Sequence, residues 1–109
     1  MTDNKKYGLI DSDLNNVISI LLKNQKIDEI ILFGSRAKGN FKEGSDIDIA
    51  LKGATLKLID IIDVTIEIDS LLLPYKFDLI IFDRINEKAL IDHINRIGIV
   101  LFSKKNQEE

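Results

Sequence analysis

Three aspartates occupy positions where carboxylates could do chemistry together. Asp46 and Asp48 lie two residues apart in the alternating segment Asp46–Leu51, so a strand there puts both side chains on one face. Asp78 interrupts the otherwise apolar segment Lys76–Phe82, and a carboxylate among buried neighbours is costly unless it is paired or bound to a metal. Three such acids at one edge of a sheet could hold Mg²⁺ ions that orient a triphosphate and activate a hydroxyl.

Each of these acids also has a plain structural explanation. A solvent-facing strand tolerates Asp46 and Asp48, and Asp78 fits an edge strand or an ion pair with Lys76 or Arg84. An isolated pair of aspartates is more often part of a solvated surface than a metal site. The three acids become more specific as a set because an anion-binding turn precedes them.

That turn is formed by Gly34 and Ser35, which follow the apolar run Ile30–Phe33 and open a short helix. Free amides at such a turn attract anions, and glycine lets a phosphate approach the backbone closely. Arg36 and Lys38 follow at once and could neutralise triphosphate charge, although surface solvation explains them equally well. Taken alone, a glycine–serine turn is more often a helix cap than a phosphate site.

The surrounding pattern predicts the elements that position these residues. We expect helices over 11–24, 55–71 and 87–97, a short helix at 34–39, and strands over 30–33, 46–51, 76–82 and 98–102. Asp11 or Ser12 and Asn86 are the expected helix caps, and residues 1–10 and 103–109 are expected to be loose tails. The predicted class is α+β, a small mixed β-sheet packed by helices in a single domain over 1–109.

Composition excludes several classes of protein. The chain has 109 residues and no cysteine, which excludes disulfides and thiolate zinc sites and fits a reducing cytoplasm. No apolar run is long enough to cross a bilayer, and the N-terminus lacks the apolar core of a signal peptide. The net charge of −3 argues against direct binding to nucleic-acid phosphates. Residues 41–83 carry nine acidic against four basic residues, so the acidic excess lies around the candidate site.

The motifs resemble those of a known family. The spacing of Gly34-Ser35, ten residues and Asp46-x-Asp48 is similar to the signature of the polymerase-β-like nucleotidyltransferases. GSRAKG at 34–39 and GSDIDIAL at 44–51 resemble its smallest branch, the minimal nucleotidyltransferases (MNT), and FDLII at 77–81 resembles that branch's third-acid strand. The resemblance covers about Ile30 to Phe82 and implies the polymerase-β-like nucleotidyltransferase fold.

The resemblance implies two groups of site residues. The nucleotide-binding group comprises Gly34, Ser35, Arg36 and Lys38. The catalytic and metal-binding group comprises Asp46, Asp48 and Asp78, which would hold two Mg²⁺ ions. The implied reaction moves a nucleoside monophosphate from ATP or another triphosphate to a hydroxyl and releases pyrophosphate. His93, the only histidine, is expected to have no catalytic role.

The resemblance also implies a partner and leaves three hypotheses open. Members of this branch resemble antitoxins that adenylylate a tyrosine of a HEPN-domain RNase encoded beside them. Alternatively, the chain is a weakly active module that neutralises a partner by binding, or a transferase for a small hydroxylated molecule such as an aminoglycoside. The spacing of Arg84 and His93 does not fit the RNase motif of the toxin half. The acceptor is expected to come from another chain, while the oligomeric state stays open.

Overall fold

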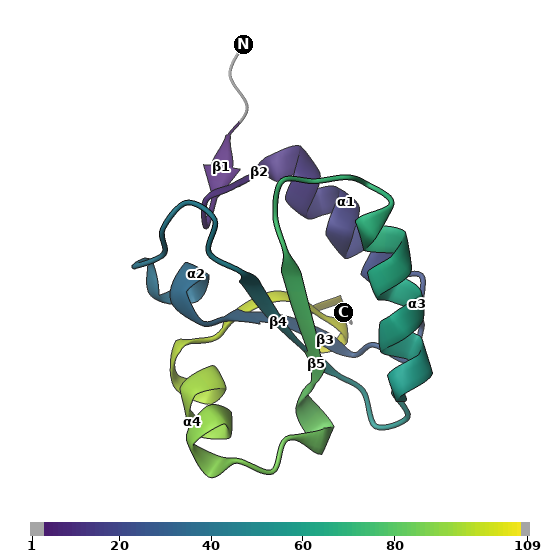
Figure 1. Ribbon diagram of the computed structural model, residues 1–109. Helices are drawn as coiled ribbons and strands as arrows, with labels where there is room; N and C mark the ends of the chain where they lie inside the picture. The colour runs from purple at the N-terminus through teal and green to yellow at the C-terminus, as the bar shows by residue number, and fades with distance from the viewer. Residues whose placement is uncertain (1–3, 108–109) are drawn as a thin grey trace.

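Four strands form a mixed sheet between two layers of helices, as the computed structural model of residues 4–107 shows (Figure 1). The helices are α1 (Asp11–Leu21), α2 (Ser35–Lys38), α3 (Leu58–Asp69) and α4 (Lys88–Ile97), with 3₁₀ turns η1 (Phe82–Arg84) and η2 (Lys104–Gln107). The strands are β1 (Lys5–Lys6), β2 (Leu9–Ile10), β3 (Glu29–Phe33), β4 (Ile47–Lys52), β5 (Phe77–Ile81) and β6 (Ile99–Ser103). This arrangement confirms the predicted α+β class.

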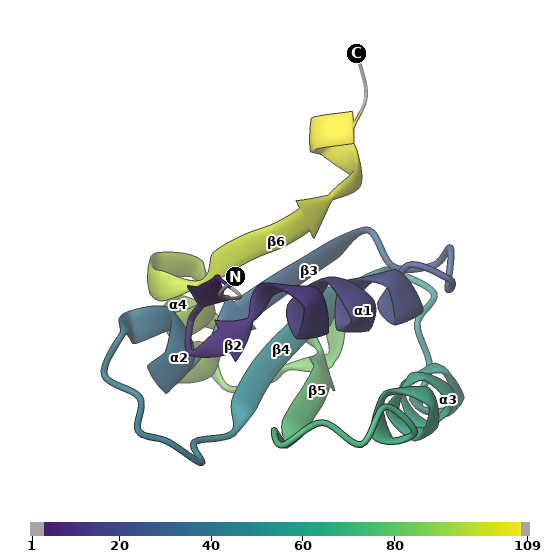
Figure 2. The ribbon, with the colours of Figure 1, turned by 90° about the horizontal axis from the view of Figure 1, so that it is seen from above.

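The order of strands in the main sheet is β5-β4-β3-β6. β3 pairs antiparallel with β4 and with β6, whereas β4 and β5 are parallel. A parallel pair needs a crossover, and α3 supplies it between β4 and β5. Figure 2 shows β5 and β6 at the two edges of the sheet. The start of β4 and the start of β5 therefore lie side by side next to the end of β3.

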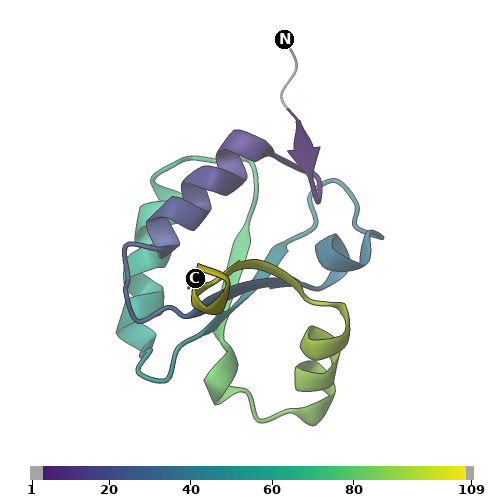
Figure 3. The same cartoon turned by 180° about the vertical axis from the view of Figure 1, so that it is seen from behind.

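Alternation along the strands separates the two faces of this sheet. One face, which includes the fully buried Ile47 and Ile49, packs against α1 and α3 in the larger apolar core. Each aliphatic side chain buried in this way contributes roughly 1.5–3 kcal/mol. The other face carries Phe33 and Ala50, which pack against Ile94 of α4. Figure 3 shows α1 and α3 on one side of the sheet and α4 on the other.

The segment 55–71 is helical, as the three- and four-residue spacing of Asp60, Asp63 and Glu67 predicts, despite its many β-branched residues. The helix is shorter at both ends than expected and is anchored by Val64 and Ile68, which are one turn apart and buried. Lys57 is its N-cap, and Asp60 in the first turn accepts a hydrogen bond from the Lys57 amide at 2.8 Å. Burial of one stripe therefore outweighs the local preference of these residues for strand.

The structure corrects the expectation of loose tails. Residues 5–10 form the β1–β2 hairpin, and Leu9 is fully buried in the main core. At the other end, Ser103 is buried in β6, and the Lys104 amide donates to the Asp28 carbonyl at 2.9 Å. Residues 1–3 and 108–109 lie outside the described part of the chain. Apolar burial at Leu9 and backbone pairing at Lys104 hold both segments in place.

The predicted helix caps are also corrected. The N-cap of α1 is Ile10 rather than Asp11 or Ser12, and that of α4 is Glu87 rather than Asn86. Neither observed cap makes a side-chain hydrogen bond. Asp11 instead lies in the first turn of α1, where the helix dipole favours an acid. The hairpin sets where α1 begins, since the Asp11 amide donates to the Asn4 carbonyl at 2.8 Å.

Candidate active site

The parallel pairing of β4 and β5 brings two of the three predicted acids together. Asp48 and Asp78 are direct partners in the register of the two strands. Both lie on the sheet face that α4 covers, because their neighbours Ile47 and Leu79 belong to the core beneath α1 and α3. Asp46 is exposed and lies just before β4 rather than within it, two residues from Asp48. The three acids thus gather where β4 and β5 begin.

The charge of Asp48 is disfavoured in this position. Burial raises the pKa of the Asp48 carboxyl, the charges of Asp78 and Asp46 raise this pKa further, and His93 partly opposes them. A cation among these oxygens would reverse that repulsion. Among residues 4–107, no group of three His, Cys, Asp or Glu side chains is arranged so that it could hold a metal ion. Carboxylate oxygens are ligands that Mg²⁺ takes in proteins, together with water and phosphate oxygens.

A pH dependence of stability follows from the raised pKa of Asp48. The folded protein favours the protonated form of Asp48. The contribution of this carboxyl to the free energy of unfolding is therefore fully present at low pH and is lost as pH rises through the raised pKa. Without divalent cations, Asp48→Asn should therefore gain thermal stability relative to the wild type as pH rises from 4 to 7. Thermal melts monitored by circular dichroism across this range measure the difference. A gap in Tm that stays constant with pH would contradict the interpretation.

Gly34 connects β3 to α2 and lies directly against Asp48. Its φ of +76° is in a region that glycine adopts readily and other residues rarely do. A Cβ atom at this position would collide with Oδ2 of Asp48. Ser35 follows as the first residue of α2. The structure therefore brings the glycine–serine turn and the aspartates into one site.

Arg36 differs from the sequence expectation. Its side chain is buried, and its guanidinium donates through Nη1 to the Tyr7 carbonyl at 3.1 Å and through Nη2 to the Ser45 carbonyl at 2.9 Å. The same group lies over the Phe41 ring. Arg36 thus ties the N-terminal hairpin to the loop that leads into β4, whereas its predicted companion Lys38 is exposed. The guanidinium of Arg36 therefore holds the site together, a role that the sequence did not predict.

His93 is a site residue that sequence reasoning missed. It projects from α4 toward the end of β3, where its Nε2 accepts a hydrogen bond from the Gly34 amide at 3.2 Å. Its ring also meets the Phe33 ring edge-on. The only available signal was the polar position of His93 between Ile91 and Ile94, which did not reveal its contact 59 residues away.

Removing this acceptor is expected to loosen the turn. In His93→Phe the ring is kept but the Gly34 amide loses its partner, so the free energy of unfolding should fall by about 1 kcal/mol. Exchange of the Gly34 amide proton should accelerate, as NMR can measure. His93→Gln, which can offer an amide oxygen instead, is the matched control and should restore protection. Equal protection of Gly34 in the wild type and His93→Phe would refute the role of this hydrogen bond.

Sequence comparison places these features in a family. Residues 15–107 match the family described as Polymerase beta, Nucleotidyltransferase, and the chain belongs to this family. No match was found among curated proteins. No helix within residues 4–107 is long and apolar enough to cross a membrane.

Several solved structures that are similar to this chain come from toxin–antitoxin complexes. A toxin–antitoxin with AMP-PNP has 29% identity and a TM-score of 0.70, with 85% of this chain and 75% of that chain covered. A Shewanella oneidensis complex of a tri-AMPylated HEPN toxin with its MNT antitoxin has 26% identity and a TM-score of 0.65, covering 88% and 74%. The MntA–HepT toxin–antitoxin shares 26% identity with a TM-score of 0.64 at the same coverage. The chain is thus similar to MNT antitoxins that are paired with HEPN toxins.

Proposed function

We propose that this chain transfers a nucleoside monophosphate, AMP from ATP, to a tyrosine hydroxyl of a HEPN-domain partner and thereby acts as an antitoxin. The observation that carries the proposal is the register of Asp48 with Asp78 beside the Gly34 turn. Support for the acceptor comes from the similar chain bound to a tri-AMPylated HEPN toxin. The absence of cysteine agrees with a reducing cytoplasm as the place of action.

The reaction assigns a role to each group of the site. The turn at Gly34 and Ser35 holds the triphosphate, and the exposed Lys38 offsets part of its charge. The acceptor oxygen forms a bond to the α-phosphorus while the bond from that phosphorus to the pyrophosphate oxygen breaks. The proton of the attacking hydroxyl leaves on the side of Asp78. Asp46, Asp48 and Asp78 would hold Mg²⁺, two ions in this proposal, which supplies Lewis-acid stabilisation of the phosphate charge when bound.

The position of the label in ATP tests the type of reaction. The chain, the HEPN-domain protein encoded beside it and Mg²⁺ are incubated with ATP labelled at either the α- or the γ-phosphate. Nucleotidyl transfer predicts that the partner is labelled only from the α-position. Label from the γ-position would instead indicate phosphoryl transfer and would reject the proposal.

The same assay, combined with a test of protection in cells that express the toxin, distinguishes the two alternatives. A module that acts by binding alone would protect cells from the toxin without labelling it, and this protection would survive replacement of Asp46 and Asp48. A transferase for small molecules would label a hydroxylated compound such as an aminoglycoside and leave the protein unlabelled. Labelled protein together with unlabelled small molecules supports the proposed acceptor.

A further inference from the structure

The outer face of α3 exposes a row of large apolar side chains. This row, named here the α3 stripe, consists of Leu58, Ile59, Ile62 and Ile66. Their exposed fractions range from 43% to 64%, and their three- and four-residue spacing puts them on one side of the helix. Among the described residues, the other exposed large apolar side chains are Leu72, soon after α3, and Val100 on β6. The apolar surface is therefore concentrated on one element.

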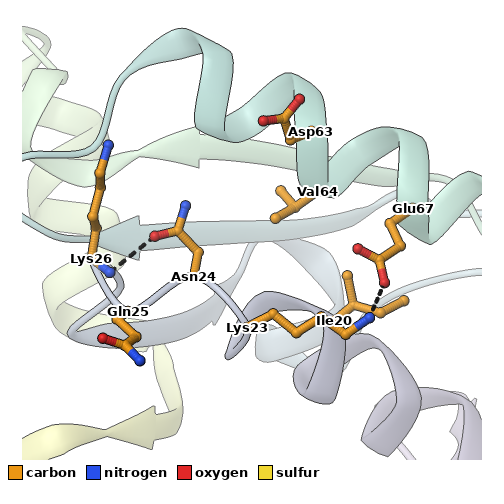
Figure 4. Close-up of a pocket in the computed structure, with 8 residues that line it drawn as sticks. All are labelled: Ile20, Lys23, Asn24, Gln25, Lys26, Asp63, Val64 and Glu67. Atoms are coloured by element: carbon orange, nitrogen blue, oxygen red, sulfur yellow. Dashed lines mark hydrogen bonds and ion pairs between the residues drawn. The ribbon is translucent and has the colours of Figure 1, made fainter.

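The helix cannot rotate to bury this stripe. Val64 and Ile68 on another side of α3 are packed into the core. A third side is held by ion pairs between Glu67 and Lys23 and between Asp60 and Lys26. Figure 4 shows this side, with Lys23 and Glu67 joined across the groove between α1 and α3. Core packing on one side and ion pairs on another thus fix α3 with the apolar stripe in solvent, whereas an ordinary surface helix turns polar residues outward.

Leu72 extends the apolar surface beyond the end of α3. Its side chain is 89% exposed. Its φ of +54° belongs to the turn that ends the helix, because the Leu72 amide donates to the Asp69 carbonyl at 3.1 Å. The fold thus fixes the backbone of Leu72 and leaves its side chain in solvent.

The charge of α3 indicates which kind of molecule binds the α3 stripe. α3 contains four acidic residues and no basic one. Two of the acids, Asp63 and Asp69, are exposed, and neither forms an ion pair with any residue between 4 and 107. A symmetric dimer through this helix would place the same acidic surface on both sides. Nucleic acid or an anionic membrane would also be repelled, so a protein with basic residues around an apolar groove fits best.

We propose that the α3 stripe docks a protein partner whose apolar groove is edged by lysine or arginine. This inference rests on the proposed function and identifies the partner with the HEPN-domain protein. The stripe belongs to the helix layer opposite α4, whereas Asp48 and Asp78 lie on the face that α4 covers (Figures 1 and 3). Docking at α3 therefore leaves the transfer site open, and the two surfaces are separable by mutation.

Calorimetric titration of the full chain with the HEPN-domain protein tests whether the partner docks at the α3 stripe. The double variant Ile62→Asp/Ile66→Asp should weaken binding at least about thirtyfold, as expected for central apolar contacts of an interface. Asp63→Lys should weaken it about threefold or more by placing like charges together. Val100→Asp is the matched control for an exposed apolar residue elsewhere, and this control should bind like the wild type.

The outcomes distinguish failure of this inference from failure of the proposed function. Equal binding by the wild type and the stripe variant would overturn the docking site but leave the partner in place. No binding by the wild type would reject the partner and the docking site together. Sedimentation of the chain alone provides a further test, since a dimer lost in the stripe variant would show that a second copy covers α3. Attachment to neutral phosphatidylcholine vesicles through the stripe would contradict a protein partner in the same way.

Discussion

Replacing Asp46 and Asp48 together by asparagine is expected to reduce transfer to the partner by at least about a thousandfold. Loss of the anionic ligands removes the charge stabilisation of a metal-assisted reaction, which is worth several kcal/mol. The fold should persist because Asp46 is exposed and precedes β4, and because removing the Asp48 charge relieves repulsion by Asp78. Transfer of label from α-labelled ATP measures the effect, and circular dichroism verifies the fold.

Asp63→Asn is the matched control for this double variant. Asp63 is an exposed acid on α3, within the same acidic part of the sequence but outside the transfer site. Its transfer rate at saturating partner concentration should equal that of the wild type. Transfer by Asp46→Asn/Asp48→Asn within tenfold of the wild type would show that these acids do not hold the metal ions that the proposed reaction requires.

Gly34→Ala is expected to have the second large effect, on both stability and transfer. The added Cβ would enter the space of the Asp48 carboxylate, and alanine at a φ of +76° is strained. Strain of this kind costs roughly 1–3 kcal/mol, and relieving the collision moves either the turn or Asp48. Transfer should fall at least about a hundredfold because a displacement of about 1 Å at a reacting centre has that effect.

Gly39→Ala is the control that distinguishes the effect of backbone strain from the effect of displacing the site. Gly39 also has a positive φ, of +88°, but no atom lies within 4 Å of the position that its Cβ would take. This variant should lose comparable stability in thermal melts and retain most of its transfer activity. If Gly39→Ala and Gly34→Ala lost transfer equally, the contact of Gly34 with Asp48 would not explain the effect.

The sequence predicted the main sheet because its signals are local. Alternation in 46–51 and the apolar run at 30–33 identify strands whatever lies around them. The same alternation predicted that Asp48 lies on the face opposite to Ile47 and Ile49, which are buried in the main core. Pairing of Asp48 with Asp78 depends on the parallel register of β4 and β5, which the sequence pattern alone left undetermined. The family resemblance supplied that part of the candidate site.

Long-range contacts account for what the sequence did not predict. The hairpin at 5–10 exists because Leu9 reaches the main core and because Arg36 binds the Tyr7 carbonyl 29 residues away. His93 approaches Gly34 only because α4 packs on the face that carries Phe33. No periodicity encodes such contacts, so polar residues with structural partners resemble solvated ones in the sequence. The exposed apolar face of α3 was not predicted for a related reason. The stripe formed by Asp60, Asp63 and Glu67 suggested that the acids mark the solvent side of this helix.

Intact-mass spectrometry of the partner tests the central claim most directly. The chain is mixed with the HEPN-domain protein, Mg²⁺ and each nucleoside triphosphate in turn, alongside Asp46→Asn/Asp48→Asn. We predict that the partner gains one or more AMP units with ATP and wild-type protein, on a tyrosine that peptide fragmentation identifies, and gains nothing with the double variant. An unchanged partner mass with all four triphosphates, in a mixture where the complex forms, would contradict nucleotidyl transfer to this partner.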